Sequence, residues 1–131
     1  MRGNPPRYVV RESEPYEIDR DSVFLSLLAS DPGYAGRWLK RLGEVTNALA
    51  EFPGPGAHAT EEAASDRYKR EVRRLFYYGP TRRRSGVPVR ILFTIFPPAT
   101  DDPPETAESV ILLLRLLHVR QVLDPGDPAE G

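Results

Sequence analysis

The sequence has no cysteine and only one methionine. Without cysteine the chain forms no disulfide bond and no thiolate metal site, and this composition suits a reducing cytoplasm, where we expect the protein to act. Long apolar runs are also missing: the longest aliphatic stretch spans about five residues, whereas crossing a bilayer takes roughly 20. The opening residues, MRGNPPRYVV, lack the apolar core of a signal peptide. We therefore expect no contact with a membrane.

The composition is that of a globular protein, with 40% hydrophobic and 28% charged residues in a chain of 131. A chain of this length forms one domain and buries roughly two thirds of its unfolded surface. We place that domain at residues 1–123 and expect a disordered tail at 124–131. An acidic, proline-rich stretch at 97–108 is typical of a long loop in a hairpin.

Positive charge is concentrated in one short stretch of a chain whose formal net charge is −1. Residues 67–90 contain nine basic residues and one acidic residue, a balance of +8. Residues 61–66, residues 101–108 and the tail are acidic. This asymmetry indicates that one face of the domain meets a polyanion or an acidic partner. The alternative is a solvated hairpin whose arginines only provide solubility.

Hydrophobic periodicity predicts two helices between about 21 and 52. Asp19 or Asp21 is placed to cap the first helix, and Asp31 is placed to cap the second. Pro32 suits the first position of the second helix, because its missing N–H is not needed there. Few residues join the two helices, so we expect an antiparallel pair. The second helix has one apolar stripe, formed by Trp38, Leu42, Val45, Leu49 and Phe52.

Strands are predicted on both sides of these helices. The run YVV, an aromatic residue followed by two β-branched ones, precedes them. After a loop at 54–66, the stretch at 72–78 is rich in aromatic residues. Residues 87–96 alternate between a wholly apolar face and a face that contains Arg90. We expect the apolar face to pack under the helices and Arg90 to point away from them. Residues 110–120 fit a helix by their leucines or a buried strand by their β-branched residues.

Three sequence segments, in this order, resemble the RelE/ParE superfamily of bacterial toxins from type II toxin–antitoxin modules. WLKRLGEVTNALAEFP closes the helical hairpin, VRRLFYYG and VPVRILFTI give two successive strands, and ILLLRLLHVRQ ends in His-x-Arg. The resemblance covers about residues 7–120. It implies an α+β fold, in which a small antiparallel β-sheet of about four strands carries an N-terminal helical hairpin on one face. It also makes 110–120 a strand.

The resemblance to the RelE branch implies cleavage of messenger RNA on the ribosome, with the ribose 2′-hydroxyl as the nucleophile. The protein then positions the backbone, stabilises charge on the phosphate and moves protons, and arginine suits the first two tasks. Matching the motifs assigns catalytic roles to Arg90 and Arg120 on the phosphate. His118 is the expected proton carrier, since it shares a face with Arg120 if the segment is a strand.

Other basic residues are expected to bind RNA phosphates. Arg73 and Arg74 fall where the RelE branch has basic residues, with a register that is open by a residue or two. We expect Arg73 to share one surface with Arg90 and Arg120, away from the hairpin. Tyr77 and Tyr78 suit base stacking, although one of the two is expected in the core. The phosphate-binding candidates are Arg70, Arg73, Arg74, Arg82, Arg83 and Arg84.

The resemblance leaves two alternatives to RNA cleavage. The ParE branch inhibits DNA gyrase by binding it, and the long helical hairpin and near-neutral charge of this chain suit that branch. A homologue that keeps the fold without activity is the other alternative. The expected protein partner is a cognate antitoxin, whose acidic segment would cover the basic face. No cofactor and no metal site are expected, because the proline-rich loop would hold Asp101, Asp102 and Glu105 only loosely.

Overall fold

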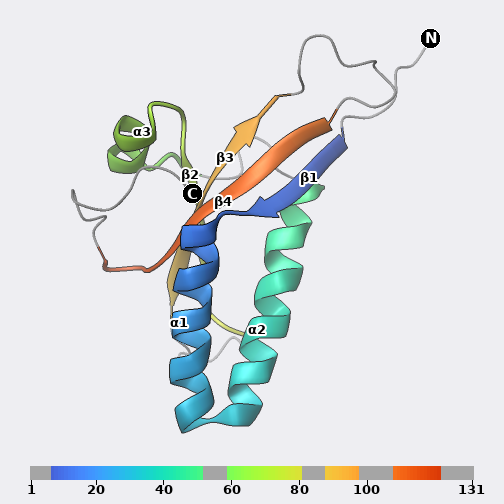
Figure 1. Cartoon of the computed structure of the whole chain (residues 1–131), viewed down its shortest axis with the longest axis vertical. Helices are drawn as coiled ribbons and strands as arrows, with labels where there is room; N and C mark the ends of the chain where they lie inside the picture. Colours follow the sequence, from blue (N-terminus) through green and yellow to red (C-terminus); the bar gives the residue numbers. More distant parts are fainter. Residues whose placement is uncertain (1–6, 52–58, 81–87, 98–107, 122–131) are drawn as a thin grey trace.

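The computed structural model describes residues 7–51, 59–80, 88–97 and 108–121. The chain folds into an α+β domain in which a helical hairpin packs against a four-stranded sheet (Figure 1). In chain order, its elements are β1 (Arg7–Glu12), α1 (Glu14–Ser30), α2 (Pro32–Asn47), the 3-10 turn η1 (Ala48–Ala50), α3 (Glu62–Tyr68), β2 (Arg73–Tyr77), β3 (Val89–Phe96) and β4 (Glu108–His118). The expected fold class and the N-terminal hairpin are confirmed.

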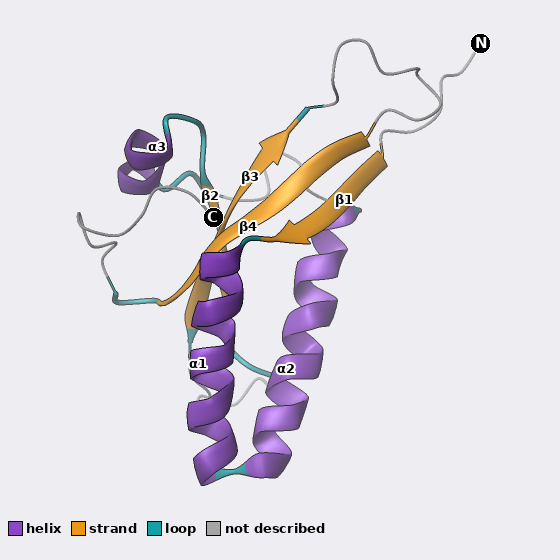
Figure 2. Cartoon of the chain, in the orientation of Figure 1, coloured by secondary structure: helices purple, strands orange, loops and turns teal. Residues whose placement is uncertain are grey.

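The described strands lie in the order β1-β4-β3-β2. β4 pairs antiparallel with β3, and β3 pairs antiparallel with β2, as expected. β1 runs parallel to β4, with Val9 opposite Val110, so the sheet is mixed. Figure 2 shows β1 beside β4, and the closed end of the α1–α2 hairpin projecting beyond these strands.

The hairpin begins earlier than the sequence predicts. α1 starts at Glu14, and its cap is the hydroxyl of Ser13, which accepts a hydrogen bond from the Tyr16 N–H at 3.2 Å. The prediction of a cap at Asp19 or Asp21 was wrong, because Asp19 instead accepts hydrogen bonds from Arg115 on β4. The start of α2 is confirmed.

The cap of α2 is Asp31, whose carboxylate accepts from the Tyr34 N–H at 3.0 Å, and Pro32 follows it. α2 ends at Asn47 and the 3-10 turn at Ala50, so the predicted end near 52 was late. The Thr46 hydroxyl donates to the carbonyls of Leu42 and Gly43, and such back-bonding favours the end of a helix.

Each face of the sheet carries an apolar cluster. The hairpin face has the alternation that the sequence predicts, and its core includes Trp38, Leu42, Ile91, Phe93 and Leu116. The other face holds a second apolar cluster, formed by Ala64, Val72, Leu92, Leu114 and Leu117. Ala64 belongs to α3, so the prediction that 54–66 is entirely loop was wrong. A short helix there shields Leu92 and Leu117 from water.

The segment from 110 to 120 is a strand up to His118, as the resemblance implies. Its register shifts at one point: Leu92 of β3 lies opposite Arg115, and Phe93 lies opposite Leu113. Leu114 is therefore an extra residue on β4, a β-bulge. Because of the bulge, Leu113 and Leu116 both belong to the hairpin-side core although they are three positions apart.

Candidate functional site

An open hollow of about 320 Å³ lies on the α3 face of the sheet, beside the end of β4. We call it the arginine hollow. Three arginines and one glutamate are among the residues that line it. It is lined by Glu61, Ala63, Arg74, Phe76, Arg90, Val119, Arg120 and Gln121.

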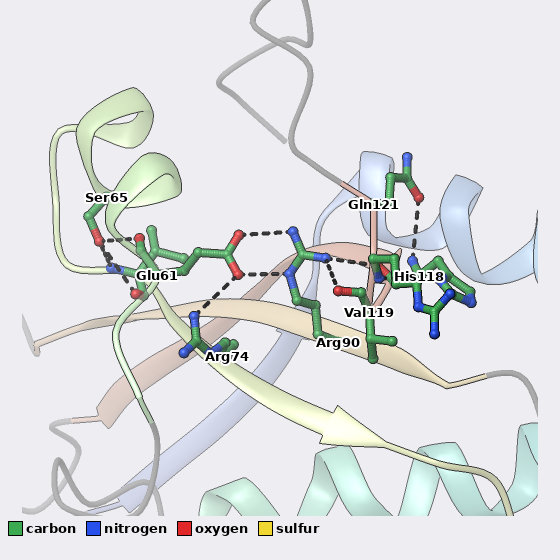
Figure 3. Close-up of polar contacts among 9 residues, drawn as sticks. Glu61, Ser65, Arg74, Arg90, His118, Val119 and Gln121 are labelled. Carbon is green, nitrogen blue, oxygen red and sulfur yellow. Dashed lines mark hydrogen bonds and ion pairs between the residues drawn. The ribbon is translucent and has the colours of Figure 1, made fainter. Parts of the chain in front are cut away.

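Arg90 and Glu61 form a two-point ion pair in this hollow (Figure 3). Arg90 Nε donates to Glu61 Oε1 at 2.7 Å, and Nη2 donates to Oε2 at 3.3 Å. The remaining terminal nitrogen of Arg90 donates to the carbonyl of His118 at 2.8 Å. These bonds hold a largely buried guanidinium beside the Glu61 carboxylate.

The start of α3 positions Glu61. Its backbone N–H donates to the Val72 carbonyl at 2.8 Å, and its own carbonyl accepts from the N–H and the hydroxyl of Ser65. The first turn of α3 is thereby tied to the residue that precedes β2. Arg74 completes the charge arrangement, with Nη1 3.9 Å from Glu61 Oε1. One buried carboxylate therefore lies between two guanidinium groups from adjacent strands.

Arg74, and not Arg73, shares a face with Arg90. Tyr77 of β2 packs against Trp38 and donates its hydroxyl to the Trp38 carbonyl at 2.8 Å. Since side chains alternate along a strand, Arg73 lies on the hairpin face with Tyr77, and it pairs with Glu71 at 2.8 Å. The prediction that Arg73 joins Arg90 on one surface was therefore wrong.

Arg70 also lies away from the arginine hollow. Its Nε donates to the Thr94 hydroxyl at 3.1 Å, its Nη2 donates to the Ile95 carbonyl at 3.2 Å, and its guanidinium lies 3.7 Å from the Phe96 ring centroid. These contacts hold the connection between α3 and β2 against β3. The predicted phosphate-binding residues at 82–84 lie outside the described residues.

The prediction that His118 and Arg120 share a strand face was wrong. β4 ends at His118, and Arg120 lies in the turn that follows it. His118 pairs with Val89, a residue of the hairpin-side core, so its side chain lies on the opposite face from Arg90. Its ring nitrogen Nδ1 accepts from the Arg120 N–H at 3.1 Å. Of these two residues, Arg120 lines the arginine hollow and His118 does not.

Glu61 was not among the predicted site residues, because it lies in an acidic segment that the sequence predicts to be loop. The available signal was the short run EEAASD, whose small residues favour a helix close against a neighbouring surface. In the part of the chain that the structure describes, no group of three metal-ligating side chains occurs. Asp101, Asp102 and Glu105 lie outside that part. No described helix has the length and apolar character that a membrane crossing requires.

The site therefore combines a positioned carboxylate with three arginines that line the same open hollow. Guanidinium groups bind phosphate oxygens, and a carboxylate accepts a proton. No protein-family model, curated protein or solved structure matches this chain.

Proposed function

We propose that the chain is the toxin of a type II toxin–antitoxin module, similar to the RelE/ParE superfamily, and that it cleaves messenger RNA in the arginine hollow. The observation that carries this proposal is the Arg90–Glu61 pair, 2.7 Å apart, in a hollow that Arg74 and Arg120 also line. This set supplies both groups that the reaction needs: cations for the phosphate and a proton acceptor.

The arginines bind the phosphate in this mechanism. An RNA phosphate entering the hollow offers Arg90 a second anion in place of Glu61. Arg74 and Arg120 add charge at the same phosphate and stabilise the negative charge that grows on it. Removing one such preorganised donor costs about 10²–10³-fold in rate. As Arg90 turns to the phosphate, the Glu61 carboxylate becomes available to the ribose.

Glu61 then acts as the proton acceptor. The 2′-hydroxyl oxygen attacks the adjacent phosphorus while Glu61 takes the hydroxyl proton, and the bond from phosphorus to the 5′-oxygen breaks. Solvent water supplies a proton to that leaving oxygen, and Glu61 later returns its own proton to solvent. The products are a 2′,3′-cyclic phosphate and a 5′-hydroxyl. A positioned proton acceptor contributes about 10²–10⁴-fold. His118 has no part in this step.

The test is primer extension on messenger RNA from cells that express the chain or a variant. We expect cleavage by the wild type on translated messages, and a loss of at least about 100-fold for Glu61→Gln. Glu17→Gln, an exposed carboxylate on α1, is the matched control and keeps full cleavage. Urea unfolding of each variant first establishes that it folds. Full cleavage by a folded Glu61→Gln variant would overturn the mechanism.

A second candidate function is non-enzymatic inhibition of DNA gyrase. It is favoured by an exposed apolar row on α1, consisting of Ile18, Leu25 and Leu28, which is the kind of surface that a protein partner covers. Growth arrest with a DNA-damage response and intact messenger RNA would support this function. Expression without toxicity would indicate a homologue that keeps the fold without activity.

The cell-level role follows from the toxin proposal. Cleavage of translated messages would inhibit translation in the cytoplasm. A cognate antitoxin would hold the chain inactive, and such a pair contributes to plasmid stabilisation. Co-expression with a neighbouring small protein, followed by size-exclusion chromatography, tests the partner: a single co-eluting peak is expected.

A further inference from the structure

Two large aromatic side chains are exposed side by side at the end of β2. Phe76 is 42% exposed and Tyr78 is 61% exposed. Their ring centroids are 6.2 Å apart, and their planes differ by 18°. Aromatic rings usually leave water in a folded domain, since each buries a large apolar area. A stacked pair that stays in water therefore marks a surface where another flat group can pack.

The core explains why the pair points outward. Tyr77 lies between the two residues and is buried against Trp38, with ring centroids 5.8 Å apart. Because side chains alternate along β2, burying Tyr77 sends its two neighbours to the other side. Phe76 lies opposite Arg90 in the β2–β3 register. The aromatic pair is thus fixed next to the proposed cleavage site.

A second hollow of about 560 Å³ begins at this pair. We call it the aromatic hollow, and it is lined by Arg41, Val45, Phe76, Tyr77, Tyr78, Gly79 and Pro80. Phe76 lines both hollows. Cations are present on both sides of it: the Arg74 guanidinium lies 5.7 Å from the Phe76 ring centroid, and Arg41 lines the aromatic hollow. The aromatic hollow and the arginine hollow therefore adjoin at Phe76.

We propose that the aromatic hollow is a base-stacking subsite for single-stranded RNA. It rests on the proposed function, because the arginine hollow supplies the place for the reacting phosphate. The base next to that phosphate stacks on Phe76 and Tyr78, and Arg41 meets the following phosphate. Alternating aromatic and basic side chains along a groove are the usual means of binding unpaired strands. A duplex keeps its bases inside and cannot use this subsite.

The test measures binding without cleavage. The probe is a fluorescent single-stranded 2′-O-methyl RNA octamer, which has no 2′-hydroxyl to react. Two further probes are compared with it: the same octamer with one abasic position, and the corresponding duplex. Fluorescence anisotropy is measured for the wild type, the double variant Phe76→Ala/Tyr78→Ala, and Phe76→Trp. Leu25→Ala is the matched control, because Leu25 is also 61% exposed and lies on α1.

We expect the double variant to bind the single strand at least about tenfold more weakly than the wild type, as loss of a stacking platform predicts. Leu25→Ala retains wild-type binding, whereas Phe76→Trp, which enlarges the stacking face, binds at least as tightly as the wild type. The abasic octamer binds the wild type more weakly than the intact octamer, but the double variant binds both equally. Preference for the duplex, equal loss in Leu25→Ala, or no binding of any probe at micromolar concentration would each overturn the subsite.

Failure of the subsite and failure of the proposed function are separable. If primer extension detects cleavage while the octamer binds without the aromatic pair, the function stands and the subsite is wrong. If the wild type binds the octamer more tightly than the double variant but cleaves no message, the subsite stands and the cleavage proposal is wrong.

Discussion

Arg115 of β4 donates two hydrogen bonds to Asp19 of α1, from Nε to Oδ2 at 2.6 Å and from Nη2 to Oδ1 at 3.1 Å. The Leu116 N–H donates to the same carboxylate at 3.0 Å. The side chains of Arg115 and Asp19 are only 11% and 16% exposed. This contact ties the first helix to the last described strand, immediately after the β-bulge at Leu114.

Removing the carboxylate should therefore destabilise the fold. Asp19→Ala leaves the Arg115 charge in a mostly buried position without this carboxylate, and we expect a loss of about 3 kcal/mol in the free energy of unfolding. Asp21→Ala, which breaks the exposed pair of Asp21 with Arg20, should change it by less than about 1 kcal/mol. Urea unfolding monitored by circular dichroism measures both. Equal losses in the two variants would contradict the role of this contact.

Ser13 links the same two elements through its hydroxyl. Its Oγ accepts from the Tyr16 N–H and donates to the Leu114 carbonyl at 3.0 Å, and the residue is buried. Ser13→Ala should lower the free energy of unfolding by about 1–2 kcal/mol, because it removes a helix cap and a buried hydrogen bond. Ser22→Ala, at an exposed position of α1, is the control. A loss below about 0.5 kcal/mol for Ser13→Ala would show that neither bond matters.

Stability should decrease at alkaline pH. Burial raises the pKa of the phenols of Tyr16 and Tyr77 well above its ordinary value, which is about 10. Above pH 10 the unfolded chain loses these protons while the folded chain keeps them, so the free energy of unfolding falls by up to about 1.4 kcal/mol per pH unit for each phenol. Below pH 10 this contribution is complete. Urea midpoints between pH 8 and 11 measure the slope.

Tyr77→Phe tests the assignment of that slope. It removes one of the two buried phenols, so the alkaline decrease should become shallower, with Tyr78→Phe as the exposed control. The same slope in wild type and Tyr77→Phe would exclude Tyr77 as a source.

Arg74 and Arg73 should differ in their effect on RNA binding. Arg74 lines the arginine hollow, whereas Arg73 lies on the hairpin face. Arg74→Ala should weaken binding of the single-stranded octamer and reduce the slope of log affinity against log salt by about 0.7, the value for one phosphate contact on a single strand. Arg73→Ala should leave the slope unchanged. An unchanged slope in Arg74→Ala, or the same reduction in Arg73→Ala, would contradict this assignment.

The elements with the strongest local pattern were predictable. Trp38 and Leu42 lie on the buried side of α2, and Ile91 and Phe93 lie on the buried side of β3. When an element packs on one face only, its apolar residues recur with the period of a helix or of a strand, so the sequence identifies the element. The sequence of β4 fits a helix as well as a strand, for a physical reason. The bulge at Leu114 shifts the alternation, so the buried leucines 113 and 116 recur at a spacing that a helix also produces.

The candidate site was predictable only in part. Arg90 could be assigned to the face away from the hairpin because its strand alternates cleanly. The choice between Arg73 and Arg74 could not be made, since it depends on the packing of Tyr77 against Trp38, 39 positions earlier. Glu61 is 29 positions from Arg90, and no local pattern reports a contact at that distance. Such pairings are set by tertiary structure alone.

The parallel pairing of β1 with β4 has a consequence for how the chain is made. Ser13 and Leu114, which are bonded just past the last β1–β4 residue pair, are 101 positions apart. While the ribosome synthesises the intervening residues, β1 has no neighbouring strand and the apolar side of the hairpin has no β4 to cover it. The nascent chain therefore emerges with its N-terminal half unfinished. A protein proposed to attack translation would become competent only after the ribosome that made it has read through β4.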